Sequence, residues 1–396
     1  MPPAVHHALV LNLHQPGGNL AALLDQPNPR GEDGWEGKEI LFALDRIARS
    51  LWAYDDLGRV HLACSGTLLE TLADPAFQAK AYGVVKCGDL LWHWQNRRLI
   101  EILGTGYYHP VLPLIPEADR EQHLARWQAL AAHLFSRHDF SGCWPPEMGF
   151  SMELIPLLKR LGYDYVIVDS ENVTAVDTMD WPTLRYRPHW AEYEGERIMV
   201  VVRDRQLSDA QESGLDVGWF VREVTERTRH CDFEPLVLTA TDGDNGGWFR
   251  NFREGSNFWS GFYQPLLEAA RRNEHNIRPC FIHDYIRQHG VHGRVQVETA
   301  AWNTGWHHGK EFVQWTGSDA QKAALARVQK FSAEFHRVLD RAPKSGPARD
   351  ALEQVHWRLL RAETSCHFFW GEAWVSRCHQ DLDDASRLLE RMKEEG

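Results

Sequence analysis

The feature that most constrains the fold of this chain is a repeated alternation of short apolar runs with amphipathic helical patterns. Residues 8–13 form the first apolar run, which predicts a buried strand. Residues 39–54 follow, with apolar side chains recurring every three to four positions, as in a helix. Further strands are predicted at residues 60–64, 102–104, 142–144, 165–169, 198–202, 236–240 and 294–297. Further helices are predicted at residues 117–135, 152–161, 219–229 and 258–271.

This alternation predicts parallel strand–helix–strand units, and about seven of them favour an α/β fold of the (β/α)7 incomplete TIM-like barrel type. A doubly wound sheet is the alternative. From residue 318 the pattern is helical only, with helices expected at 318–342, 348–366 and 374–395. We therefore expect a catalytic barrel over residues 1–300. A C-terminal helical bundle over residues 301–396 would pack on the barrel and complete a substrate groove.

Charge and composition narrow the class of partner. The formal net charge of -12 argues against nucleic acid or an anionic membrane as partner, because both are bound through basic patches. The chain shows neither an apolar stretch long enough to span a membrane nor a basic leader, so we expect a cytoplasmic protein. Its 7 scattered cysteines predict reduced thiols. The 17 tryptophans exceed ordinary usage, and aromatic faces bind sugar rings, so some should line a groove.

Four polar clusters follow predicted strands. Because the carboxyl ends of barrel strands meet on one face, we expect these clusters to converge there. They are His14-Gln15-Pro16, residues 104–110 with His109, residues 144–149 with Trp144 and Glu147, and residues 242–248 with Asp242, Asp244 and Trp248.

Glu147 is the first candidate for catalysis. Two prolines and a tryptophan precede it and Gly149 follows, so the backbone is stiff on one side and free to turn on the other. That arrangement suits a carboxylate fixed in space. The alternative is an acidic cap of the following helix, a role that Ser151 would fill equally well.

Asp242 is the second candidate, because it ends an apolar run and enters a glycine-rich loop that lets a bulky ligand approach the backbone. Glycoside hydrolysis requires at least two carboxyl groups, and here two lie on separate strand ends. A calcium loop built on Asp242, Asp244 and Asn245 is the alternative, although the distal glutamate of an EF-hand is missing.

His14 and His109 admit three interpretations: donors to sugar hydroxyls, core histidines, or zinc ligands. A zinc-dependent glycosidase or deacetylase is thus the rival enzyme class. The chain has no H-E-x-x-H motif, and His6-His7 and His307-His308 are adjacent pairs whose side chains diverge. We therefore expect catalysis without a metal or another cofactor.

The four clusters, in this order, resemble the motifs of glycoside hydrolase family 57, which include His-Gln-Pro and Trp-x-Pro-Glu. A fifth family motif resembles residues 363–372 here, so the resemblance extends from Leu13 to Glu372. It implies a (β/α)7 barrel with a helical bundle and a retaining mechanism on α-linked sugars, mostly α-glucans.

Carried over by position, Glu147 matches the family's nucleophile and Asp242 its general acid/base. His14 and His109 match positions that contact the sugar. A tryptophan-rich loop that borders the groove in family members resembles Trp302, Trp306 and Trp315 here. The full set of expected substrate-binding residues is His14, Gln15, His109, Trp144, Asp244, Trp248, Trp302, Trp306, Trp315 and Trp370.

Three departures from the family pattern affect the expected substrate. Asp244 stands where the family commonly has Glu, glycines follow Asn245 in place of Phe-Gly, and Cys366 occupies a frequent Asp position. Because the chain ends soon after its bundle, we favour an α-amylase-like hydrolase of α-1,4-glucosidic bonds. The alternatives are a 4-α-glucanotransferase, a branching enzyme or an α-galactosidase. A glycan-binding barrel without turnover is the non-enzyme alternative.

Overall fold

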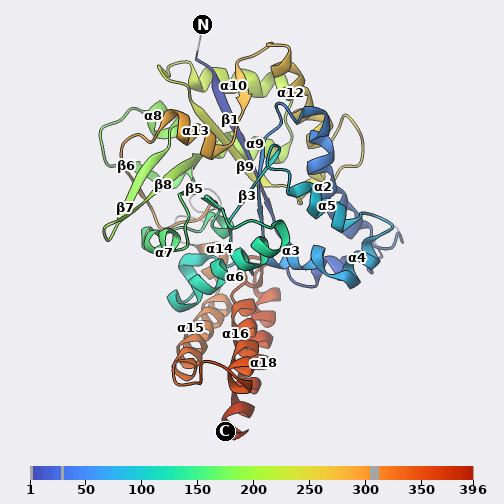
Figure 1. Cartoon of the computed structure of the whole chain (residues 1–396), viewed down its shortest axis with the longest axis vertical. Helices are drawn as coiled ribbons and strands as arrows, with labels where there is room; N and C mark the ends of the chain where they lie inside the picture. The colour runs from blue at the N-terminus through green and yellow to red at the C-terminus, as the bar shows by residue number, and fades with distance from the viewer. Residues whose placement is uncertain (1–2, 28–30, 304–311, 396) are drawn as a thin grey trace.

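The computed structural model describes residues 3–27, 31–303 and 312–395, and its centre is a nearly closed barrel of parallel strands (Figure 1). The strand order is β3-β2-β1-β9-β8-β5-β4, and a parallel bridge between Gly104 and Cys143 joins the two outer strands. The (β/α)7 prediction is confirmed. The barrel strands are β1 (Val5–Leu13), β2 (Val60–Cys64), β3 (Ile100–Leu103), β4 (Gly142–Cys143), β5 (Tyr165–Asp169), β8 (Glu196–Arg203) and β9 (Leu236–Asp242).

Strand periodicity sorts the apolar side chains into two layers. On β1, Ala8 and Val10 belong to a core cluster shared with β9, β5 and β8, which fills the barrel interior. Leu9 and Leu11 belong to a second cluster, shared with the surrounding helices. Both faces of the barrel sheet are therefore packed against apolar side chains. This explains why the strands are continuous apolar runs.

Helices cover the outside of the barrel, as the amphipathic patterns predict. The predicted helix at 258–271 begins as a π-helical turn, Trp259–Tyr263, before α12. The helices of the barrel region are α1 (Asn19–Leu23), α2 (Trp35–Leu51), α3 (Gly66–Ala73), α4 (Pro75–Ala81), α5 (Cys87–Trp94), α6 (Glu117–Phe135), α7 (Ile155–Arg160), α8 (Trp181–Tyr186), α9 (Arg205–Ser213), α10 (Val217–Thr228), α11 (Gly246–Phe249), α12 (Gln264–Arg271) and α13 (Ile282–His289).

The strand predicted at 294–297 exists but does not belong to the barrel. It is β11 (Val295–Val297), which pairs antiparallel with β6 (Val173–Ala175). Two other short strands extend the main sheet: β7 (His189–Tyr193) pairs antiparallel with β8, and β10 (Ile277–Pro279) pairs with the first residues of β1. An apolar run of three or four residues predicts a strand but contains no information about its partner.

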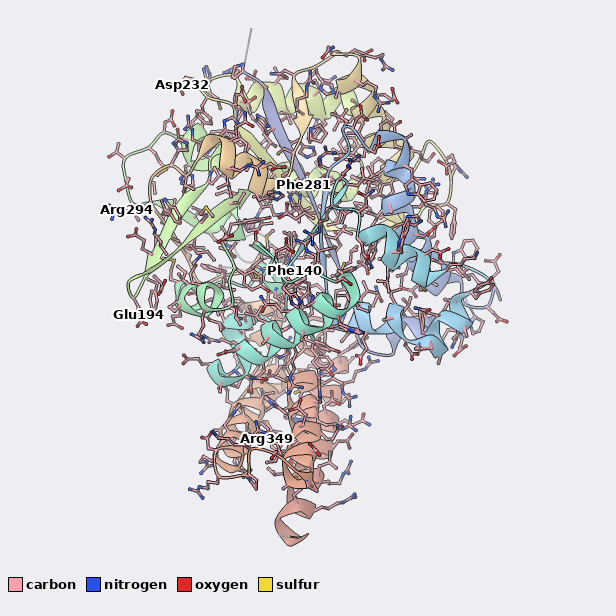
Figure 2. The ribbon with its side chains drawn as sticks, viewed as in Figure 1. Phe140, Glu194, Asp232, Phe281, Arg294 and Arg349 are labelled. Carbon is pink, nitrogen blue, oxygen red and sulfur yellow. The ribbon has the colours of Figure 1, made fainter. Side chains whose placement is uncertain are left out.

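The C-terminal helices form a separate layer at one end of the barrel (Figure 1). Their apolar faces share one core cluster. In Figure 2, Arg349 marks this layer and Asp232 marks the opposite end of the molecule. The helices are α14 (Val313–Thr316), α15 (Asp319–Leu339), α16 (Pro347–Ala362), α17 (Cys366–Phe369) and α18 (Glu372–Glu395). No described helix has the length and apolar character that a membrane span requires.

A buried polar network joins α6 of the barrel to these helices. Asp119 on α6 accepts hydrogen bonds from Ser332 (2.5 Å) and His336 (2.7 Å) on α15 and from His356 (3.3 Å) on α16. Glu363, just after α16, contacts His123 of α6 at 2.9 Å. Because all of these groups except the partly exposed His336 are buried, the network favours one position of the helical layer on the barrel.

Candidate active site

A cavity of about 960 Å³ lies where the carboxyl ends of the barrel strands face the C-terminal helices. Both layers supply its walls, so the site is complete only when the helices are seated. The residues that line it are Asn12, His14, Gln15, Pro16, Asn19, Leu23, Glu36, His109, Glu147, Arg203, Arg205, Asp209, Glu212, Ser213, Asp242, Asn245, Gly246, Arg250, Trp302, Asn303, Cys366, Phe369, Trp370 and Trp374.

Glu147 follows β4, and both of its carboxylate oxygens are held. Ser365 donates a 2.6 Å hydrogen bond from Oγ to Oε1. The indole Nε1 of Trp302 donates a 2.9 Å hydrogen bond to Oε2. His109 Nδ1 lies 3.6 Å from Oε1. These contacts come from three distant segments, so the orientation of the carboxylate is fixed from several sides.

Backbone strain is concentrated beside this carboxylate. Glu147, Met148 and His109 have φ values of 56°, 50° and 56°, in the left-handed region that side chains with a Cβ rarely adopt. Each such residue costs on the order of 1 kcal/mol and persists only where the surroundings hold it. Glu147 is not a helix cap, because its carboxylate oxygens accept hydrogen bonds from Ser365 and Trp302 rather than from the amides of the next helix.

Burial controls the ionisation of Glu147. It raises the pKa of this carboxyl to about 7, the hydrogen bonds from Ser365 and Trp302 oppose the shift, and the charge of Asp242 adds to it.

Asp242 is the last residue of β9 and lies on the strand face that includes Leu238 and Ala240. Asn12 donates a 2.8 Å hydrogen bond to its Oδ1, and Asn245 donates a 3.2 Å hydrogen bond to its Oδ2. Burial raises the pKa of Asp242, which favours the protonated form that a general acid needs. The next residue, Gly243, has no room for a Cβ, which would lie 2.9 Å from side-chain atoms of Leu11 and Leu13.

His14 and His109 stack face to face, with ring centroids 4.1 Å apart and planes inclined by 6°. Burial lowers the pKa of His109 to about 3, and burial together with His109 lowers the pKa of His14 well below its usual value. Both imidazoles are therefore neutral at neutral pH and offer a donor and an acceptor each. His14 Nε2 also contacts Cys366 Sγ at 3.3 Å.

Aromatic side chains border the cavity on the helical side. Trp302 lies edge-on to Trp144 at 5.6 Å, with Arg203 over its ring at 5.7 Å. Trp370 and Trp374, whose ring centroids are 6.3 Å apart, form an aromatic edge at the cavity mouth. Trp370 is 58% exposed, so a face remains available to a ligand.

Four residues predicted to contact substrate do not line the cavity, contrary to that prediction. Trp144 is fully buried in the barrel interior, and Trp315 is buried in the core of the helical layer. Trp248 packs edge-on to Phe258, among side chains of the outer core. Asp244 is fully buried behind Gln15, which donates a 2.9 Å hydrogen bond to its Oδ2.

The geometry around Asp244 also argues against a calcium loop. Burial and the charge of Asp242 raise the pKa of Asp244 to about 7. The oxygen-bearing side chains of the loop do not converge on a common point. Asn245 donates to Asp242, whereas Asp244 faces Gln15. The last predicted contact, Trp306, lies outside the described residues.

The histidines of the cavity do not form a metal-ligand cluster with an acid. Among the described residues, two groups have the spacing that a metal ion needs, and neither includes His14 or His109. The stacked rings of these two residues face each other rather than a common point.

A family comparison agrees with this architecture. Residues 30–298 match the model of glycosyl hydrolase family 57. The chain belongs to this family. Its members are enzymes of the glycoside hydrolase kind, which fits two carboxylates and stacked neutral histidines at the carboxyl end of a barrel.

Relatives within family 57 are distant. The chain is 22% identical over 247 residues to alpha-amylase 1 of Dictyoglomus thermophilum, a match over 60% of this chain and 33% of that protein. It is 30% identical over 187 residues to a 4-alpha-glucanotransferase of Thermococcus kodakarensis, over 45% of this chain and 26% of that one. This chain therefore spans about a third or less of the curated relatives.

Solved structures show the same fold. A family 57 branching enzyme of Pyrococcus horikoshii superposes with a TM-score of 0.72 at 14% identity, over 98% of this chain and 88% of that one. The 4-alpha-glucanotransferase of Thermococcus litoralis has a TM-score of 0.65 at 18% identity, over 93% and 56%.

Sequence reasoning missed several residues of this family 57 site, among them an asparagine and an arginine at strand ends. Asn12 and Arg203 are two positions beyond inward residues of β1 and β8, so strand alternation would have found them. Arg203 and Arg205 both bind the carboxylate of Asp169, at 2.7 and 2.8 Å. Ser365 lies within the run that resembles the fifth motif, but neither its contact with Glu147 nor the approach of Trp374 to the cavity is marked by a local pattern.

Proposed function

We propose that the chain is a retaining glycoside hydrolase that acts on α-glucans, with Glu147 as nucleophile and Asp242 as general acid/base. One observation supports this most strongly. The two carboxylates line one cavity, where Glu147 is held by Ser365 and Trp302 while Asp242 is bound by two amides. Two carboxyl groups on separate strand ends that line one cavity are the pair that double displacement requires, and their hydrogen-bond partners support the division of roles.

In the first step, the Glu147 carboxylate attacks the anomeric carbon while Asp242 gives its proton to the glycosidic oxygen, which leaves as a hydroxyl. In the second, Asp242, now ionised, takes a proton from water, and the resulting hydroxide displaces Glu147 from the sugar. His14 and His109, both neutral, are positioned to hydrogen-bond sugar hydroxyls without competing for the proton.

The substrate proposal rests on the relatives and on the cavity mouth. The similar proteins named above are an alpha-amylase and a 4-alpha-glucanotransferase, both of which act on α-glucans. In this chain, Trp370 and Trp374 provide an aromatic edge on which successive glucose rings can stack.

We propose hydrolysis, as in an α-amylase, as the principal reaction. Both reactions share the covalent intermediate, and the acceptor decides between them. The wall contributed by α9 contains Arg205, Asp209 and Glu212 and no aromatic ring, which favours water over a second sugar as acceptor. Transfer to a sugar, branching and α-galactoside cleavage are the alternatives on the same scaffold.

Product analysis tests this proposal. Maltoheptaose, glycogen and an aryl α-galactoside are incubated side by side with the chain and with Glu147→Gln. We expect new reducing ends and shorter maltooligosaccharides from the first two substrates, and none with the variant. Longer oligosaccharides without new reducing ends would assign a transferase instead. Unchanged substrates with a folded protein that still binds them would assign a glycan-binding barrel.

A further inference from the structure

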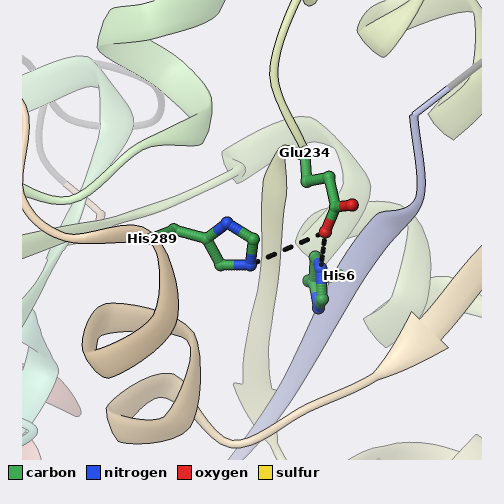
Figure 3. A group of neighbouring side chains, drawn as sticks. All are labelled: His6, Glu234 and His289. Atoms are coloured by element: carbon green, nitrogen blue, oxygen red, sulfur yellow. Dashed lines mark hydrogen bonds and ion pairs between the residues drawn. The ribbon is translucent and has the colours of Figure 1, made fainter.

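Three potential ligands of a metal ion meet at the end of the barrel opposite the cavity (Figure 3). They are His6 on β1, Glu234 in the loop before β9 and His289 at the end of α13. Each offers one ligand atom, and the three atoms lie within 4.8 Å of one another. Segments separated by up to 283 positions in the sequence therefore meet at one point, and the catalytic mechanism uses none of them.

Strand pairing places the first two ligands together. His6 pairs with Leu236 in the β1–β9 ladder, and its backbone NH donates to the carbonyl of Pro235 at 2.8 Å. Glu234 is the next residue back along the chain, so its side chain reaches His6 Nε2, which lies 2.8 Å from Oε2. Because strand side chains alternate, His7 faces away and bonds Thr239 instead.

His289 completes the group, and Tyr285 holds it in place. Its Nε2 lies 3.6 Å from Glu234 Oε2 and makes no hydrogen bond within the described part of the chain. Tyr285, one turn earlier on α13, stacks on the His289 ring at 4.4 Å and lies edge-on to His6 at 5.2 Å. Its hydroxyl donates a 2.6 Å hydrogen bond to the carbonyl of Glu234. One tyrosine thus positions all three ligands, as residues behind a metal site do.

We propose that His6, Glu234 and His289 bind a single zinc-class divalent ion. Two imidazoles with one carboxylate are a donor set that suits Zn²⁺ rather than Ca²⁺ or Mg²⁺, which prefer oxygen ligands. Ligands about 2.0 to 2.2 Å from a tetrahedral ion lie roughly 3.3 to 3.6 Å from one another, close to the contacts of 2.8 and 3.6 Å found here. Glu234 is 41% exposed, which leaves access for a water as fourth ligand.

In the other group with metal-ligand spacing, the potential ligand atoms are already hydrogen-bonded to one another. Asp119, His336 and His356 are joined by direct hydrogen bonds, and Ser332 occupies the second oxygen of Asp119. That carboxylate is completely buried with both oxygens engaged, so an ion would have to break an existing network. At His289, by contrast, a buried nitrogen lacks a hydrogen-bond partner.

The site is remote from catalysis. His6 and Asn12 lie on the same face of β1, six positions apart, which corresponds to about 20 Å at 3.3 Å per residue. The ion would link the start of β1, the loop before β9 and the end of α13. Since it binds only the folded chain, it should stabilise the barrel without entering the reaction.

Zinc binding to the full chain tests the proposal. Protein stripped with a chelator and dialysed is titrated calorimetrically with Zn²⁺, Ca²⁺ or Mg²⁺ alone, and thermal unfolding is followed at each concentration. We expect a single tight Zn²⁺ per chain, a melting temperature that rises with Zn²⁺ and not with Ca²⁺ or Mg²⁺, and unchanged turnover well below the melting temperature. Absence of tight Zn²⁺ binding, or turnover that requires added Zn²⁺, would overturn the proposal.

Variants locate the ion. Glu234→Gln and His289→Ala should each weaken Zn²⁺ binding by more than about 100-fold, and Tyr285→Phe by about 10-fold. His336→Gln, in the other group, is the matched control and should retain wild-type affinity. Co²⁺ provides a second readout, because a tetrahedral site gives strong visible absorption that the first two variants should lose. Zn²⁺ affinity that survives in Glu234→Gln, a half-exposed and conservative change, or that is lost in His336→Gln, rejects this site.

Discussion

Ser365 donates a 2.6 Å hydrogen bond to Glu147, across 218 positions of sequence and from the helical layer into the barrel. Ser365 is itself anchored to the barrel, because its backbone NH donates to the carbonyl of His109 at 3.0 Å. The helical layer thus does more than cover the cavity. It supplies one of the two hydrogen bonds that orient the proposed nucleophile.

Replacing Ser365 should weaken the nucleophile. In Ser365→Ala the ionised form of Glu147 loses a charge-assisted hydrogen bond that contributes about 1.5 to 3 kcal/mol, so kcat should fall roughly 10- to 100-fold. The pKa of Glu147 should rise, and the acid limb of the pH profile should move to higher pH. Ser365→Thr should restore much of the rate. Ser386→Ala, on α18 and bonded to Leu382, is the control and should behave as wild type.

The pH dependence of the unaltered enzyme follows from the same carboxylate. Glu147 must be ionised to attack, and burial raises its pKa to about 7. As pH falls below that value, Glu147 becomes protonated, so kcat/KM should drop about tenfold per pH unit. Initial rates measured from pH 4 to 9 check this. A flat profile down to pH 5 would contradict a raised pKa for Glu147 in the folded enzyme.

Replacing Glu147 and replacing Asp242 by the corresponding amides should affect activity in different ways. Glu147→Gln should abolish activity on every substrate, because no covalent intermediate forms. Asp242→Asn should retain part of its activity on aryl glycosides, whose leaving groups need little protonation, and azide should accelerate release of the trapped sugar. Asp244→Asn is the control, since this side chain lies behind Gln15. Azide rescue in Asp244→Asn and not in Asp242→Asn would reassign the acid/base.

Stereochemistry provides a check independent of mutation. A double displacement retains configuration, so proton NMR of the first products from an α-glucan should show α-anomers, and the carboxyl groups of Glu147 and Asp242 should be roughly 5 to 5.5 Å apart in a crystal structure. Initial β-anomers would indicate inversion and exclude a glycosyl-enzyme on Glu147.

The Asp119 network should control the stability of the junction. Although burial opposes ionisation, hydrogen bonds from His336, His356 and Ser332 lower the pKa of Asp119 below its usual value. Asp119→Ala should reduce the free energy of unfolding by about 3 to 5 kcal/mol, measured by urea denaturation at pH 7. Asp139→Ala, which removes exposed contacts with Arg97 and Arg137, should cost less than about 1 kcal/mol.

The stabilisation by Asp119 should depend on pH. A carboxyl whose pKa is lowered on folding stabilises the fold above its unfolded pKa, and this contribution is lost as pH falls through the folded pKa. The stability difference between the unaltered chain and Asp119→Ala should therefore be full at neutral pH and shrink only in strong acid. A difference that is the same at pH 2 and pH 7 would contradict this account.

The sequence by itself determined the barrel and the carboxylates at its mouth. Apolar runs with helices between them leave few ways to bury both faces of a parallel sheet, and polar residues at strand ends must then meet on one rim. That reasoning placed His14, His109, Glu147 and Asp242 in one cavity.

Only the tertiary structure decided which polar and aromatic neighbours of those residues reach the cavity. Trp144 and Asp244 are two or three positions from the carboxylates yet point away, because loop backbone angles, which local sequence does not specify, set the direction of each side chain. Ser365, directly before α17, and Trp374, on α18, come from the helical layer, more than 100 positions away in the sequence. Their approach depends on how the helical layer is seated on α6, and long-range packing of that kind leaves no periodic trace in the chain.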